Sequence, residues 1–224
     1  MSLAGIHAVI VDLDGTMVDT AGDFQVAINR MRAEFDLSPL PVQTITDFVG
    51  KGSEHLIRSV LSLDWEAQQV LDRFEAAMAS YQRHYFAING DYSNLYPGVA
   101  EGLEALKTKD LQLACVTNKP IAFTEPLLKK KGLRSFFELV YGGDSLPRKK
   151  PDPTPMLQVC DDFGLKPRQV VAIGDSINDA LAARAAGCYV LHVPYGYNHG
   201  HAIQEVDSDG IVETLLHAAQ LITK

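Results

Sequence analysis

Five short apolar runs, each followed at once by polar or glycine residues, constrain the fold of this chain more than any other feature. The runs are rich in β-branched residues, which is typical of strands buried on both faces of a sheet. They occupy residues 7–11, 111–116, 139–141, 170–173 and 189–193. We therefore predict five buried strands, each of which ends in a polar loop.

Helical segments are predicted between the later strands. They lie at residues 98–109, 122–131, 154–163 and 178–186. This alternation of strand and helix favours right-handed crossovers and an α/β fold, with a Rossmann-like parallel sheet covered by helices on both faces. Ligands of such folds bind beyond the carboxyl ends of the strands, so the loops at those ends are where chemistry is expected.

Residues 21–90 follow a different pattern, with no buried-strand run. Apolar residues instead recur with helical periodicity at residues 24–35, 54–61 and 65–86. We interpret this stretch as an all-helical cap domain inserted into a catalytic core made of residues 1–20 and 91–224. The borders at residues 19–20 and 91–97 are polar and turn-forming, as hinges between a core and a lid would be.

The charge balance limits the classes of partner. The chain has 224 residues and a formal net charge of −8, which argues against a nucleic-acid-binding surface or a polybasic membrane anchor. No apolar run is long enough to span a membrane, and three widely spaced cysteines suggest reduced thiols rather than a disulfide framework. We expect a soluble cytoplasmic protein, a monomer or small homo-oligomer, that meets an anionic ligand through a local positive site.

The first polar loop holds the pentad Asp12 to Thr16, with carboxylates at Asp12 and Asp14. Two carboxylates this close repel one another unless a cation or a proton intervenes, and a divalent cation is one such reason for their spacing. Strand alternation is expected to place both on the same side, and Gly15 permits a tight turn beside them. An Asp-Gly turn alone would explain only the last part of the pattern.

Three later loops add groups to the same sheet edge. Thr117 and Asn118 offer a hydroxyl and an amide to phosphoryl oxygens, although a helix N-cap at Thr117 would explain that residue as well. The basic stretch at residues 148–153 is stiffened by two prolines and could hold one lysine rigidly, although such loops are usually solvated. Asp175 and Asp179 supply two more carboxylates. Oxygen-rich surroundings of this kind suit a hard cation, Mg²⁺ above all.

Taken together, these segments resemble the haloacid dehalogenase superfamily, whose signature begins Asp-x-Asp-x-Thr and ends Gly-Asp-x-x-x-Asp. The resemblance implies that Asp12 is a nucleophile that becomes an aspartyl-phosphate and that Asp14 is the general acid and base. The dehalogenases that name the superfamily lack this second aspartate, so Asp14 implies phosphoryl transfer.

The same resemblance assigns the remaining roles. Thr117 and Lys150, the lysine directly before a proline, would hold the phosphoryl group. Mg²⁺ would be bound by Asp12, the backbone carbonyl of Asp14 and Asp175, with Asp179 in or next to the ligand shell. These roles imply a magnesium-dependent phosphatase that acts on a small phosphorylated metabolite.

Three further stretches resemble the phosphoglycolate phosphatase group of that superfamily, which implies 2-phosphoglycolate as substrate. They lie at residues 18–20, 49–52 and 195–198. Gly50 and Lys51 would then belong to a substrate-specificity loop, although that group usually has a small or amide residue at the position of Lys51. Lys51, His55 and Arg58 are candidates to meet a second anionic group of the substrate.

Two other functions stay open on the sequence. A sugar-phosphate phosphatase or a phosphomutase would share every core motif, and a catalytically silent binding module could keep the fold. A silent module would usually have lost the nucleophile or the lysine, whereas Asp12 and Lys150 are both present.

Overall fold

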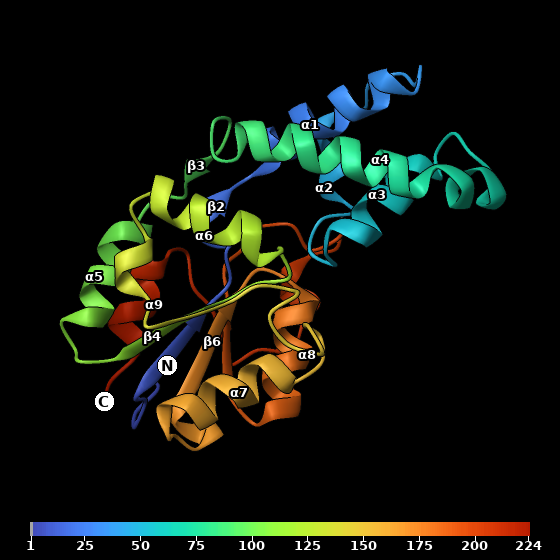
Figure 1. Cartoon of the computed structure of the whole chain (residues 1–224). Helices are drawn as coiled ribbons and strands as arrows, with labels where there is room; N and C mark the ends of the chain where they lie inside the picture. Colours follow the sequence, from blue (N-terminus) through green and yellow to red (C-terminus); the bar gives the residue numbers. More distant parts are fainter. Residues whose placement is uncertain (1) are drawn as a thin grey trace.

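The computed structural model describes residues 2–224, so Met1, the first residue of the expected core, lies outside the described part. It confirms the α/β class: a six-stranded parallel sheet with the order β5-β4-β1-β6-β7-β8 (Figure 1). The strands are β1 (Ala8–Val11), β4 (Gln112–Val116), β5 (Leu139–Tyr141), β6 (Val170–Gly174), β7 (Tyr189–His192) and β8 (Gly210–Ile211).

The prediction of five buried strands is wrong in two details. Strand β8 is an additional edge strand, and its two residues are too short to leave an apolar run in the sequence. Strand β5 is half-buried rather than buried, because it lies at the opposite edge of the sheet and pairs only with β4.

Side-chain alternation in the central strands divides the sheet region between two apolar clusters. Val9 and Val11 face the cluster under helices α5 (Val99–Lys107), α6 (Ile121–Lys130) and α9 (Leu215–Leu221). Ile10 faces the cluster under α7 (Thr154–Phe163) and α8 (Ile177–Ala186). Helices therefore cover both faces, as the sequence predicts, although α9 was not expected.

Helices α1 to α4 form a separate layer above one end of the sheet (Figure 1). They are α1 (Ala21–Glu34), α2 (Val42–Thr46), α3 (Ser53–Leu61) and α4 (Ala67–Ile88). We call residues 21–90 the helical region and the rest of the described chain the sheet region. The helical region has its own apolar cluster, in which Ile28, Ile57 and Tyr81 are buried. Helix α2 was not predicted, because five residues are too few to show a periodic pattern.

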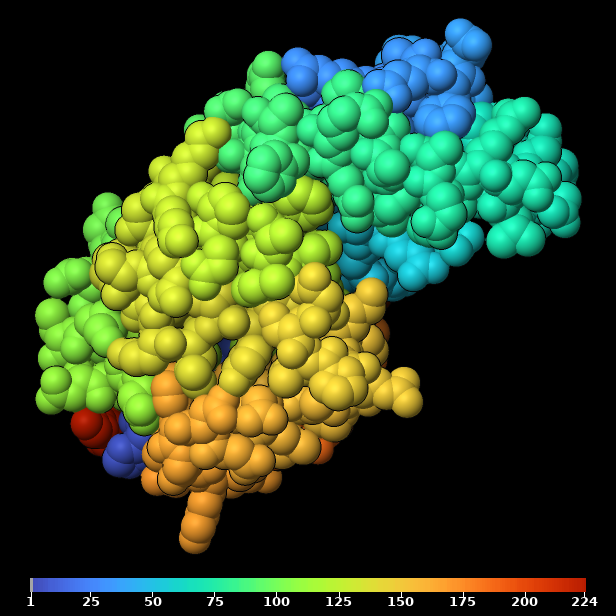
Figure 2. Space-filling model, in the orientation of Figure 1, coloured from blue at the N-terminus to red at the C-terminus, as the bar shows by residue number. Residues whose placement is uncertain are grey.

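The two connections between the regions pair with each other. Strand β2 (Val18–Asp19) leads into the helical region and lies antiparallel to β3 (Asn94–Leu95), which leads out. The predicted borders are thus hydrogen-bonded to one another. Figure 2 shows the helical region projecting from the sheet region. Within residues 2–224, no helix combines the length and apolarity needed to cross a bilayer.

Short 3₁₀ helices complete the chain. They are η1 (Arg134–Phe136), η2 (Pro167–Gln169) and η3 (Ile203–Glu205). The three cysteines are free and buried, in agreement with the expectation of reduced thiols.

Candidate active site

Three carboxylates meet at the carboxyl ends of β1 and β6. Asp12, Asp175 and Asp179 are buried and offer oxygen atoms that all lie within 4.8 Å of one another. The strand register brings them together, since Val11 lies opposite Ile173 and the backbone N–H of Asp12 donates to the carbonyl of Ile173 at 3.0 Å. We call these three residues the carboxylate cluster.

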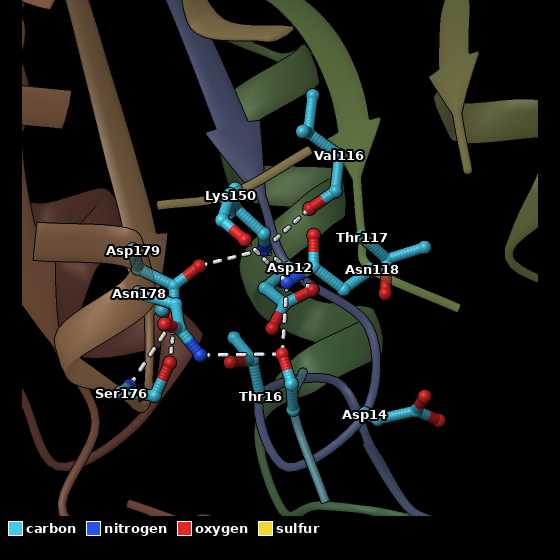
Figure 3. Close-up of polar contacts among 12 residues, drawn as sticks. Asp12, Asp14, Thr16, Val116, Thr117, Asn118, Lys150, Ser176, Asn178 and Asp179 are labelled. Carbon is cyan, nitrogen blue, oxygen red and sulfur yellow. Dashed lines mark hydrogen bonds and ion pairs between the residues drawn. The ribbon is translucent and has the colours of Figure 1, made fainter. Parts of the chain in front are cut away.

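Lys150 supplies the positive charge beside the carboxylate cluster (Figure 3). Its Nζ lies 2.9 Å from Oδ1 of Asp12 and 2.7 Å from Oδ1 of Asp179. It also donates to the carbonyl of Val116 at 2.8 Å. The neighbouring Lys149 is exposed, so the loop directs only one of its two lysines inward. The alternative interpretation, a basic loop exposed to solvent, is therefore wrong for Lys150, whose side chain is buried.

Burial and mutual repulsion shape the electrostatics of the carboxylate cluster. Burial raises the pKa of Asp12 to about 6, and the charge of Lys150 opposes this. Burial, then the charges of Asp12 and Asp179, raises the pKa of Asp175 well above its usual value. Burial would also raise the pKa of Asp179, but the charge and hydrogen bond of Lys150 lower it overall. Asp12 and Asp179 thus share the ammonium of Lys150, whereas Asp175 has no cationic partner among residues 2–224.

Two glycines leave room for Asp175. A Cβ on Gly15 would lie 2.3 Å from Oδ2 of Asp175, and a Cβ on Gly196 would lie 2.2 Å from the same side chain. Thr16 Oγ1 donates to Oδ1 of Asp175 at 2.8 Å, and the backbone N–H of Tyr197 donates to Oδ2. Asp175 is therefore held in one position by contacts from two loops. No sequence pattern marks the contact between Gly196 and Asp175, which depends on how the two loops meet.

The residues of the carboxylate cluster could hold a metal ion. Its donors are oxygen atoms, and Oδ1 of Asp12 is buried without a hydrogen bond although Lys150 lies beside it as an ion pair. The surplus of buried negative charge is what a divalent cation would neutralise. Asp179 is already engaged, since Lys150 and Ser176 donate to its two oxygens, at 2.7 Å and 2.8 Å.

Asp14 does not join the carboxylate cluster, contrary to the expected convergence of four acidic side chains. Strand β1 ends at Val11, and the chain turns where Gly15 N–H donates to the carbonyl of Val18 at 2.9 Å. Strand alternation therefore does not extend to Asp14, and its carboxylate points away from Asp12 (Figure 3). Its carboxylate is not one of the three that lie within 4.8 Å of one another.

The partner of Asp14 is Lys119, which sequence reasoning did not select. Nζ of Lys119 lies 3.0 Å and 3.2 Å from the two oxygens of Asp14. The hydroxyl of Thr20 donates to Oδ1 of Asp14 at 2.9 Å. No local signal marks Lys119, because a lysine in a polar loop is normally solvated. Its adjacency to Thr117 and Asn118 was the one available hint.

A pocket lies at the junction of the two regions, and we call it the junction pocket. From the sheet region it is lined by Asp12, Asp14 and Thr117, and from the helical region by Phe24, Gly50 and Tyr81. Its cavity is small, about 30 Å³.

Of the remaining predicted residues, Asn118 and Gly50 line the junction pocket and Lys51 does not. The side-chain amide of Asn118 donates to the carbonyls of Gly50 and Lys150, each at 2.8 Å, so both of its hydrogens are used within the protein. Gly50 thus joins the regions through its backbone. Lys51 is exposed and is absent from the lining that residues 2–224 provide, so the structure does not bring it to the predicted site.

Comparison with known proteins gives consistent results. The model of the haloacid dehalogenase-like hydrolase family matches residues 9–193. A phosphoglycolate phosphatase of Nitrosospira multiformis is 47% identical over 219 residues, covering 98% of this chain and 96% of its own. A plasmid-encoded phosphoglycolate phosphatase of Cupriavidus necator is 41% identical, covering 96% of this chain and 93% of its own. A crystal structure of a predicted phosphoglycolate phosphatase from Haemophilus somnus has a TM-score of 0.91 and 33% identity, with 97% and 98% coverage.

Proposed function

The chain belongs to the haloacid dehalogenase-like hydrolase family, and on that premise we propose that it is a magnesium-dependent phosphatase that converts 2-phosphoglycolate to glycolate and phosphate. The observation that carries the proposal is the pairing of Asp12 with Lys150 inside the buried carboxylate cluster. Relatives named phosphoglycolate phosphatase, similar over nearly the whole chain, support the choice of substrate.

In the proposed reaction, a carboxylate oxygen of Asp12 attacks phosphorus and forms an aspartyl-phosphate, which water then hydrolyses. Carboxylate and phosphate are both anionic, so neutralisation of charge matters more than nucleophile strength. Lys150 and the Thr117 hydroxyl would hold phosphoryl oxygens. When bound by Asp12, the Asp14 carbonyl and Asp175, Mg²⁺ would neutralise charge on those oxygens, with Asp179 next to its shell.

Asp14 is proposed to give a proton to the leaving alkoxide and later to take one from the attacking water. Its position on the junction-pocket side, away from the carboxylate cluster, is consistent with that role, because the leaving group must depart from the face opposite Asp12. Thr20 and Lys119 restrict the orientation of its carboxylate.

We also propose that residues 21–90 act as a cap domain, which closes over the core of residues 1–20 and 91–224. The carbonyl of Gly50 accepts hydrogen bonds from Asn118 at 2.8 Å and from Asn178 at 3.2 Å, both in the sheet region. These contacts support a closed position that excludes bulk water from the reaction. Opening would release the product.

The relatives named phosphoglycolate phosphatase favour a two-carbon substrate over a sugar phosphate. A sugar-phosphate phosphatase or a phosphomutase on the same core is the alternative. The cytoplasmic location and the monomer or small homo-oligomer expected from the sequence stay predictions.

Phosphate release tests the proposed function. The wild-type protein should hydrolyse 2-phosphoglycolate faster than glucose 6-phosphate or an aryl phosphate, and chelation of Mg²⁺ should abolish the reaction. Asp12→Asn should lower the rate by about 10⁴-fold or more, as loss of a nucleophile does. Asp161→Asn, an exposed change on α7, is the matched control. Rapid hydrolysis of the hexose phosphate alone would refute the substrate, and residual Asp12→Asn activity near wild type would refute the mechanism.

A further inference from the structure

Lys119 is a buried cation in the junction pocket. Its side chain is 2% exposed, and Nζ donates to the Tyr85 hydroxyl at 2.6 Å as well as to Asp14. The same Nζ lies 4.6 Å from the ring centroids of Phe24 and Tyr85. Two aromatic faces and two hydrogen-bond partners therefore fix the ammonium at the boundary between the regions.

The other cations considered for a second anionic group are engaged elsewhere or lie outside the junction pocket. Arg58 forms an ion pair with Glu54 at 3.0 Å and stacks 3.8 Å above the ring of Phe74. Burial, together with the charges of Lys51 and Lys149, lowers the pKa of His55, which favours its neutral form. Among residues 2–224, the lining of the junction pocket includes one cationic side chain, that of Lys119.

Lys119 lies beside the residue that is proposed to protonate the leaving group. Asp14 must approach the leaving oxygen to protonate it, and Nζ of Lys119 is 3.0 Å from the Asp14 carboxylate. A group attached to the leaving oxygen through one carbon therefore lies within reach of the ammonium. In 2-phosphoglycolate that group is a carboxylate.

We propose that Lys119 binds the carboxylate of the substrate and so selects phosphate esters that carry a second anion close to the leaving oxygen. This inference rests on the proposed phosphatase function. The surrounding walls include apolar side chains such as Leu56 and Phe123, and within residues 2–224 the lining offers an anion no second cationic side chain. An ester without the carboxylate would leave the ammonium bound only to Asp14 and the Tyr85 hydroxyl, and would gain no binding energy from it.

Matched pairs of esters test the proposal. The first pair is 2-phosphoglycolate and ethyl phosphate, in which a methyl group replaces the carboxylate. The second pair is 3-phosphohydroxypropionate and propyl phosphate, which differ in the same way. The wild type should prefer each acid over its uncharged counterpart in kcat/KM, by at least about 30-fold for 2-phosphoglycolate, as expected for a buried charge pair. In Lys119→Met this ratio should fall to within about 3-fold of unity.

Three control variants distinguish loss of the Lys119 charge from misfolding and from a general effect of removing a lysine. Lys119→Arg keeps the charge and should recover part of the preference, mainly through KM. Lys119→Gln is a second uncharged variant should the Met variant fail to fold. Lys129→Met removes an exposed lysine and should leave the ratio unchanged.

The two proposals fail in different ways. Equal loss of activity toward both members of a pair in Lys119→Met would mean that Lys119 only positions Asp14, and would overturn the inference. A wild type that prefers the longer acid, with a preference lost in Lys119→Met, would refute 2-phosphoglycolate as substrate while supporting the role of Lys119.

Discussion

The sheet region and the helical region contribute opposite environments to one site. The sheet region brings Asp12, Asp175 and Asp179 together with Lys150 within a buried cluster of charges. The helical region contributes apolar and aromatic walls, such as Phe24 and Tyr81. The groups that neutralise phosphate charge thus gather at the carboxyl ends of β1 and β6, from loops and from helix α8. Recognition of the rest of the substrate depends on a surface that exists only where the regions meet.

Removing the charge of Lys150, the lysine beside the carboxylate cluster, should have the largest effect on stability. Lys150→Met leaves Asp12 and Asp179 buried without their partner, so the free energy of unfolding in EDTA should fall by about 3 to 5 kcal/mol. Urea denaturation measures this, with Lys149→Met, an exposed neighbour, as control. A loss no larger than that of the control would mean that the carboxylate cluster does not need its lysine to fold.

Crowding the carboxylate cluster should have the next largest effect. In Gly196→Ala the new Cβ would lie 2.2 Å from the Cβ of Asp175, and neither atom can rotate away. We expect a loss of about 1 to 3 kcal/mol in the free energy of unfolding and weaker Mg²⁺ binding by calorimetry. Gly210→Ala, where the nearest atom is 3.5 Å away, is the control. Unchanged metal affinity would show that the position of Asp175 is not critical.

Weakening the junction should have a smaller effect. Asn178→Ala removes the hydrogen bond to the Gly50 carbonyl, at a cost of about 1 kcal/mol. Closure should then be less favourable, so hydrogen exchange near residues 42–53 should speed up and kcat/KM should fall about 5-fold. Exchange rates equal to those of the wild type would indicate that this contact does not hold the helical region in place.

The smallest effect is expected on the surface of the helical region. Hydrogen bonds from Ser80, Arg83 and His84 lower the pKa of Glu34 to about 2. Because the folded pKa lies below the unfolded value, these contacts stabilise the protein above pH 4.5 and are lost as the pH falls toward 2. In Glu34→Gln, the melting temperature should therefore depend less on pH across this window than in the wild type. An equal dependence of melting temperature on pH in the two proteins would show that the Glu34 contacts do not stabilise the fold.

Much of the fold could be predicted because its signals are local. The apolar runs ending at Val11, Val116 and residue 173 correspond to the central strands β1, β4 and β6. Once those strands are parallel and in register, Asp12 and Asp175 must lie together. Strand β8 and helices α2 and α9 were missed because segments this short leave little pattern in a sequence.

The sequence by itself therefore determined the central strands of the sheet, whose register places Asp12 and Asp175 together, and the family to which the chain belongs. Only the tertiary structure decided that the side chain of Asp14 leaves the carboxylate cluster and pairs with Lys119. It also decided that Lys51 lies outside the junction pocket. The reason is physical. Spacing along a strand fixes neighbours within the sheet, whereas contacts between the sheet region and the helical region depend on how two separately packed units meet.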